Sequence, residues 1–206
     1  MKIVSRTLRV LAATALAATV LLSQAVAAPL VSIVPADQTI NNGDPASVDI
    51  IVSGLTDPVG GFSFNLIFDD TIVEGTTYVN DPDGTMGAAP FEFSFGFLGG
   101  TGSPLDIFFG ADPTETEASL ALSQGVSFTL TRVNFLGIAN GLSPLSLRGV
   151  VLSNWDGTET LPGVQTQDGR ICVGGNCATV PEPATLLLFG IALGGLAVVR
   201  RRKQVA

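Results

Sequence analysis

The chain has 206 residues, of which 46% are hydrophobic, and a formal net charge of −8. Most of its basic residues lie near the two ends, so residues 28–180 contain 17 acidic residues, three arginines, no lysine and no histidine, a net charge of −14. This balance excludes a basic nucleic-acid-binding surface, and the missing histidine excludes the usual Ser-His and Cys-His catalytic arrangements.

The first 27 residues have the order of a secretory signal peptide. An uncharged, Ala- and Leu-rich run follows three basic residues, Lys2, Arg6 and Arg9. The small residues Ala25 and Ala27 form an A-x-A pattern at the end of the apolar run. This pattern predicts cleavage by signal peptidase, with Ala28 as the new N-terminus. The alternative is an uncleaved membrane anchor, which Pro29 disfavours because it breaks the apolar run.

Residues 28–177 are predicted to form a single all-β domain. Apolar and polar residues alternate in short runs such as Phe62–Phe68, and turn-forming pairs such as Asn140-Gly141 separate the runs. The pattern predicts about nine strands in two packed antiparallel sheets. The predicted strands are residues 31–34, 47–52, 62–68, 72–79, 91–97, 105–110, 126–133, 145–152 and 170–173.

One helix and one aromatic run stand out within the domain. Asp112 is predicted to cap a short helix that has Pro113 at its first position and ends at Gly125. The four phenylalanines of the 91–97 strand are expected to pack in the core. The alternative is that part of this run, with Tyr78 or Trp155, stacks on sugar rings.

The two cysteines, Cys172 and Cys177, are separated by a glycine-containing loop that can fold back on itself. In an exported protein they are expected to form a disulfide. A zinc site is disfavoured because tetrahedral zinc needs four ligands and the chain offers two thiols and no imidazole. We therefore expect no metal and no other cofactor.

The domain resembles a cohesin. The residues that carry the resemblance are 31–34, 42–44, 47–52 and 60–69 at its start and 128–135, 145–153, 156–157 and 168–171 at its end. The resemblance implies a nine-stranded jelly-roll sandwich, and cellulosomal cohesins bind dockerin modules. No residue matches a family-specific contact set. The segment 79–84 is expected to be a turn and not a dockerin-type calcium loop, because Val79 stands where the first oxygen ligand belongs.

Residues 178–206 form a tail with its own signals. The 17 residues from Pro183 to Val199 carry no charge, and a basic cluster follows them at Arg200, Arg201, Arg202 and Lys203. This predicts a transmembrane helix over residues 184–199 whose basic end stays in the cytoplasm, so that the domain lies on the outer side of the inner membrane. A buried core helix is the alternative, which the cluster disfavours.

The motif before this apolar run is Pro181-Glu182-Pro183. Followed by an apolar span and arginines, it resembles a PEP-CTERM sorting signal, which implies recognition and removal of the tail by an exosortase-like enzyme. The two prolines hold the segment extended and accessible to a protease. The alternative is a stiff spacer without an enzyme partner.

These features predict an exported, non-catalytic protein of the cell surface or an exopolysaccharide matrix, whose sandwich binds protein or glycan. A carbohydrate-binding module is the first alternative. A weak polysaccharide hydrolase is the second, because 17 acidic residues make some carboxylate pair inevitable.

Overall fold

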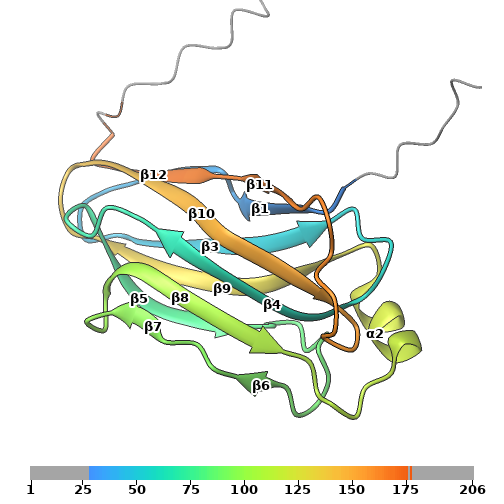
Figure 1. Ribbon diagram of the computed structural model, residues 1–206. Coiled ribbons are helices and arrows are strands. Elements are labelled where there is room, and N and C mark those ends of the chain that lie inside the picture. The colour runs from blue at the N-terminus through green and yellow to red at the C-terminus, as the bar shows by residue number, and fades with distance from the viewer. Residues whose placement is uncertain (1–27, 176, 178–206) are drawn as a thin grey trace, which may run out of the picture.

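The computed structural model describes residues 28–175 and residue 177, which form a sandwich of two β-sheets (Figure 1). The five-stranded sheet has the order β11 (Gln165–Gln167), β1 (Leu30–Val34), β3 (Pro45–Ser53), β9 (Ser127–Gly137) and β5 (Val73–Asn80). The seven-stranded sheet has the order β2 (Asp37–Ile40), β12 (Gly169–Val173), β10 (Gly141–Asn154), β4 (Val59–Ile67), β8 (Gly102–Gly110) and β6 (Phe91–Glu92), with β7 (Gly96–Leu98) also paired to β8.

The core lies between the sheets and follows the predicted alternation. In β4, Phe62, Phe64 and Leu66 are buried while the residues between them face outward. In β3, Val48 and Ile50 do the same from the opposite sheet. Because side chains alternate across an extended strand, every second residue of these strands belongs to one continuous apolar layer.

The prediction of a two-sheet antiparallel sandwich is confirmed for the long strands. Two edge pairs are parallel instead: β1 pairs with β11, and β12 pairs with β2. Both β2 and β11 are short, polar strands that the pattern did not predict. They form because the beginning and the end of the domain lie side by side in space (Figure 1).

The predicted strand over residues 91–97 is wrong in its extent. The chain forms β6 and β7 as two short strands separated by residues 93–95, and Gly96, the first residue of β7, has a positive φ of 73° that breaks the regular alternation. Only Phe97 packs in the core. The other three phenylalanines are exposed, which corrects the expectation that the whole run would pack inside.

The one helix described, α2 (Glu117–Gln124), begins later than predicted. Its N-cap is Thr116, whose hydroxyl accepts a hydrogen bond from the backbone N–H of Ser119. Asp112 instead accepts hydrogen bonds from the N–H and hydroxyl of Thr114 in the preceding turn. The helix ends at Gly125, as predicted.

Gln124 fastens α2 to the seven-stranded sheet. Its buried side-chain amide donates to the Val59 carbonyl at 2.7 Å and accepts from the Val59 N–H at 2.8 Å. These two bonds satisfy the backbone at the first residue of β4, as a neighbouring strand would.

The predicted signal segment and C-terminal transmembrane helix lie outside the described residues. Within residues 28–175 and 177, no helix has the length and apolar character needed to cross a membrane.

Candidate binding face

Most residues that the sequence singles out lie outside the described part of the chain. These are Ala25 and Ala27 of the signal site, Pro181, Glu182 and Pro183 of the sorting motif, and Arg200, Arg201, Arg202 and Lys203 of the basic cluster. Ala28, the predicted N-terminus, is the first described residue and is exposed. The structure joins Cys172 to Cys177 by a disulfide at the end of β12, with Cα atoms 5.8 Å apart.

The outer face of the seven-stranded sheet carries three rows of residues across β10, β4 and β8. The first row, at the end of β10, is Ser153, Gly61 and Gly110, with Phe91 of β6 beyond it. The second row is Val151, Ser63 and Phe108, and the third is Arg148, Asn65 and Asp106. Small and apolar residues thus meet at one end of this face and polar residues follow.

A groove of about 290 Å³ lies over the first two rows. Gly60, Gly61 and Gly110 form its floor, and it is bounded by Phe91 and Phe108 on one side and by the β10 end and its loop on the other. Glycine is unfavourable inside a strand, and there it often marks close approach of another group. A side chain on Gly110 would overlap the Phe91 ring, and one on Gly60 would overlap the Trp155 carbonyl. The local packing therefore requires two of the three glycines.

Phenylalanine side chains project from the wall of this groove. Phe93 lies between Phe91 and Phe108, with ring centroids 5.9 Å and 6.2 Å away and the rings in edge-to-face geometry. The exposed fractions are 43% for Phe91, 67% for Phe93 and 47% for Phe108, and Phe95, two residues further along the chain than Phe93, reaches 86%. Because such area is unfavourable in water, a cluster of this kind marks an interaction surface.

The opposite rim is a loop held by its own hydrogen bonds. The Asp156 carboxylate accepts from the N–H and the hydroxyl of Thr158. These bonds to Thr158 favour the charged carboxylate and lower the pKa of Asp156 below its usual range. Thr160 then pairs with Ser153 in an isolated bridge, which brings the loop back to the groove. The rim is therefore ordered and acidic.

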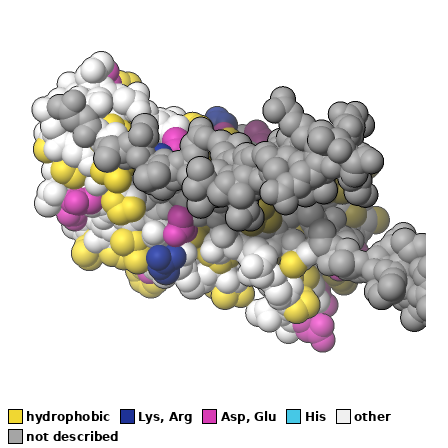
Figure 2. All heavy atoms as spheres, turned by 90° about the horizontal axis from the view of Figure 1, so that it is seen from above, with side chains coloured by type: hydrophobic (Ala, Val, Ile, Leu, Met, Phe, Trp, Pro, Cys, Tyr) yellow, Lys and Arg dark blue, Asp and Glu magenta, His cyan; other side chains and the backbone are white. Residues whose placement is uncertain are grey.

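The electrostatics of the domain are dominated by carboxylates. Each of its three arginines lies next to an aspartate: Arg132 with Asp49 at 2.7 Å, Arg148 with Asp168 at 3.5 Å, and Arg170 with Asp37. In the view of Figure 2, acidic side chains are scattered over the uncovered surface and basic ones are few. The arginines are thus neutralised locally, and most of the negative charge is left over.

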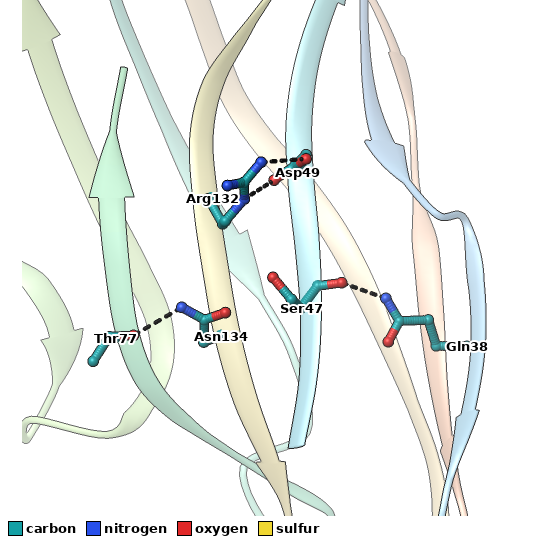
Figure 3. Close-up of polar contacts among 6 residues, drawn as sticks. All are labelled: Gln38, Ser47, Asp49, Thr77, Arg132 and Asn134. Carbon is teal, nitrogen blue, oxygen red and sulfur yellow. Dashed lines mark hydrogen bonds and ion pairs between the residues drawn. The ribbon is translucent and has the colours of Figure 1, made fainter. Parts of the chain in front are cut away.

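The outer face of the five-stranded sheet is different in kind (Figure 3). Arg132 of β9 donates two hydrogen bonds to Asp49 of β3, and these bonds raise the pKa of Arg132. Asn134 donates to the Thr77 hydroxyl on β5 at 2.9 Å, and Gln38 donates to the Ser47 carbonyl. The polar groups drawn here bind in pairs, and two exposed valines, Val34 and Val79, flank the pair of Asp49 and Arg132.

The aromatics proposed as sugar platforms divide between core and surface. Tyr78 is partly buried and packs against Phe97 at 5.9 Å, and its burial, with Glu92 nearby, raises the pKa of its hydroxyl. Trp155 is 40% exposed just beyond the groove. Sequence reasoning did not find the groove itself. The sequence feature that could have indicated the groove is the glycine pair Gly60-Gly61 at the start of a strongly alternating strand.

No group of three or more His, Cys, Asp or Glu side chains within residues 28–175 and 177 is arranged to hold a metal ion. In the turn at residues 80–84, the first carboxylate, that of Asp81, accepts local hydrogen bonds. Asp81 is buried and accepts from the Thr85 N–H and hydroxyl and from the Met86 N–H. Its oxygens are therefore engaged in shaping the loop.

Residues 179–203 match the family model of the PEP-CTERM protein-sorting motif. The match confirms the sequence prediction of this motif, and it implies an exported protein that is sorted to the cell surface. No curated protein matches the chain.

The described domain is similar to solved cohesin structures. A type II cohesin from the cellulosome of Acetivibrio cellulolyticus superposes with a TM-score of 0.56 at 15% identity, covering 70% of this chain and 95% of that one. A non-cellulosomal cohesin from Archaeoglobus fulgidus gives 0.52 at 16% identity, with 77% and 96% covered. A further Acetivibrio cellulolyticus cohesin, solved in complex with a dockerin, gives 0.52 at 16% identity, with 70% and 98% covered. The domain thus has the cohesin fold, as its sequence predicted.

Proposed function

We propose that this protein is an exported, non-catalytic binding module, which a signal peptidase frees after Ala27 and an exosortase-like enzyme processes at Pro181-Glu182-Pro183. Before processing, the apolar segment 184–199 holds it in the inner membrane. Afterwards the domain belongs to the cell surface or the extracellular matrix. The match to the sorting motif supports this route. Neither a sorting motif nor a cohesin fold is a catalytic type of module.

The phenylalanine-walled groove is the observation that carries the binding function. Three exposed phenylalanines, Phe91, Phe93 and Phe108, contact one another on the outer face of one sheet. The face of the other sheet carries hydrogen-bonded polar pairs and exposed valines but no exposed aromatic cluster among the described residues. A partner that covered Phe91, Phe93 and Phe108 would remove their apolar area from water. Buried aromatic side chains at the centre of an interface commonly supply most of its binding free energy.

A protein partner fits this groove better than a glycan. The lining consists of phenylalanine, glycine and valine with a few hydroxyl groups, and phenylalanine offers no hydrogen bond to a sugar hydroxyl. A protein can insert an aliphatic or aromatic side chain into such a groove. Cohesins of the same fold are solved with dockerins, so dockerin-like modules are the first candidates.

The surplus of carboxylates adds a second requirement on the partner. Asp156 and Glu159 stand in the loop at one rim of the groove. Complementary charge speeds association and suppresses wrong partners. We therefore expect an apolar contact segment flanked by lysine or arginine.

The binding test uses the purified domain and a panel of dockerin modules in titration calorimetry, with a glycan array in parallel. Replacing Phe91 and Phe108 by serine should weaken binding at least about 30-fold, because truncating a central aromatic residue typically costs about 2 kcal/mol or more. The matched control replaces Thr77 and Asn134 by alanine on the other sheet and should keep the affinity. Glycan binding without protein binding, or equal losses in both variants, would reject the proposed face.

The processing step has its own readout. In a host with an exosortase, the mass of the mature protein should correspond to a chain that starts at Ala28 and lacks the apolar segment. A mature chain that still contains residues beyond Pro183 would contradict exosortase processing.

A further inference from the structure

The groove and the exit of the chain toward the tail lie at opposite ends of β10. Val173, the last residue of β12, pairs with Gly141 at the start of β10, whereas Val151 and Ser153 near its end line the groove. Ten residue steps along β10 lead from Gly141 to Val151. At about 3.3 Å per step, the distance between the two residues is roughly 30 Å. Figure 1 shows β12 ending at one side of the sandwich and the end of β10 at the other.

The chain is held at the exit end up to its last described residue. The Gly174 N–H donates to the Ile40 carbonyl at 2.8 Å. The disulfide then brings Cys177 back, and its sulfur lies 3.1 Å from the Gly141 carbonyl oxygen. A pulling force on the tail is therefore transmitted to this end of the sandwich and not to the groove.

The connection from the domain to the apolar segment is short. Six residue steps lead from Cys177 to Pro183, which begins the uncharged run. At a maximum of about 3.6 Å per step they span about 20 Å. The exit end must therefore stay near the bilayer for as long as the apolar segment is inserted, and the groove is farther from the exit than the connection is long.

A second arrangement would place the sandwich flat on the membrane. The negative charge of the domain disfavours this arrangement. Anionic lipids attract basic segments and repel acidic ones. This domain has a net charge of −14 and its three arginines are paired with aspartates. Contact along its length would bring many carboxylates against anionic headgroups.

We infer that the membrane-held protein presents its groove on the side away from the bilayer, open to a partner that arrives from outside. This inference rests on the proposed function, because it takes the tail as a membrane segment and the groove as a binding site. Its consequence is that binding does not wait for removal of the tail, so processing at Pro181-Glu182-Pro183 does not switch the groove on.

The chain contains one tryptophan, Trp155, which lies just beyond the groove and serves as a native reporter. The chain from Ala28 to Ala206 is reconstituted by detergent removal into vesicles of phosphatidylcholine and phosphatidylglycerol that contain a dansyl-labelled lipid. Energy transfer from tryptophan to the dansyl group falls with the sixth power of their distance. Trp155 should therefore show little transfer.

The control moves the reporter to the exit end. In the variant Trp155→Phe/Leu142→Trp, the new tryptophan takes an exposed position opposite Cys172 on β10. With roughly 30 Å between the two ends, its transfer should be at least about fivefold stronger than that of Trp155. Ile138→Trp in the same background, also at an exposed position, gives a second reporter if the first variant does not fold.

Flotation of the vesicles separates the possible failures. If the protein does not float with the lipid, the proposed membrane segment is wrong and the inferred orientation falls with it. If the protein floats but Trp155 transfers as strongly as the exit-end tryptophan, only the orientation is overturned. Strong transfer at the exit end with little at Trp155 supports it.

Discussion

The two outer faces of this sandwich are built on the same two-residue alternation, but only the face of the seven-stranded sheet carries a cluster of exposed phenylalanines. On the five-stranded sheet, outward polar residues pair across the strands, Arg132 with Asp49 and Asn134 with Thr77. On the seven-stranded sheet, Phe108 and Val151 stand exposed beside a glycine floor. Packing of the core does not depend on which side chains face water. The difference between the side chains of the two outer faces is therefore explained by binding partners and not by folding.

The largest expected effect separates a core phenylalanine from a groove phenylalanine. Phe64→Ala should lower the free energy of unfolding by about 3–5 kcal/mol, because it leaves a cavity between the sheets. Phe108→Ser should lower it by about 1–2 kcal/mol, since the ring is half exposed and loses only part of the burial of a core side chain and its edge-to-face contact with Phe93. Urea denaturation measures both values. A large loss for Phe108→Ser would make this face structural and remove its distinction from the core.

The adjacent glycines at the start of β4 give an intermediate effect. Gly60→Ala should cost about 1–3 kcal/mol or more, because its methyl group would overlap the backbone carbonyls of Asn154 and Trp155. Gly61→Ala meets the Ser153 hydroxyl at 3.0 Å and the Phe109 carbonyl oxygen at 3.3 Å, contacts that are tight but longer than those at Gly60, and should cost less than Gly60→Ala. Its methyl group would nevertheless fill the groove floor.

Both the stability and the partner affinity of the variants Gly60→Ala and Gly61→Ala must be measured. Thermal unfolding should shift more for Gly60→Ala than for Gly61→Ala, whereas partner affinity should fall for Gly61→Ala. If Gly61→Ala bound its partner with full affinity, the groove floor would not be part of the interface.

The smallest effect is expected on the polar face. Arg132→Gln removes a two-bond ion pair with Asp49, but both side chains are partly exposed, so the loss of unfolding free energy should stay below about 1 kcal/mol. Denaturation at low and high salt checks this, because salt screening should shrink the difference between variant and parent. Partner binding should be unchanged, and a binding defect would show that the interface extends to this sheet.

Much of the fold could be predicted from local pattern. Strands such as Phe62–Phe68 alternate strongly, and the structure places the expected residues of this run in the core. The polar edge strand Gln165–Gln167 could not be predicted, because it has no buried face and exists only through its pairing with β1. Its formation depends on a contact between residues far apart in the sequence.

The phenylalanine run shows why the candidate site was missed. A two-residue period places Phe91, Phe93 and Phe95 on one side of an extended chain, but it does not say whether that side is core or solvent. The register with β8 decides this, since Phe91 lies opposite Gly110 and its ring rests on that glycine. The positive φ of Gly96 then breaks the two-residue period, and Phe97 packs in the core.

The parallel edge pairs have a consequence for the timing of export. β1 and β2 are made near the beginning of the domain, but their neighbours β11 and β12 come last in the sequence. In a polypeptide that crosses the membrane from its amino end, the five-stranded sheet lacks β11 until Gln167 has emerged, and the seven-stranded sheet lacks β12 until Val173 has emerged. Completion of the sandwich thus coincides with arrival of the sorting motif at the membrane.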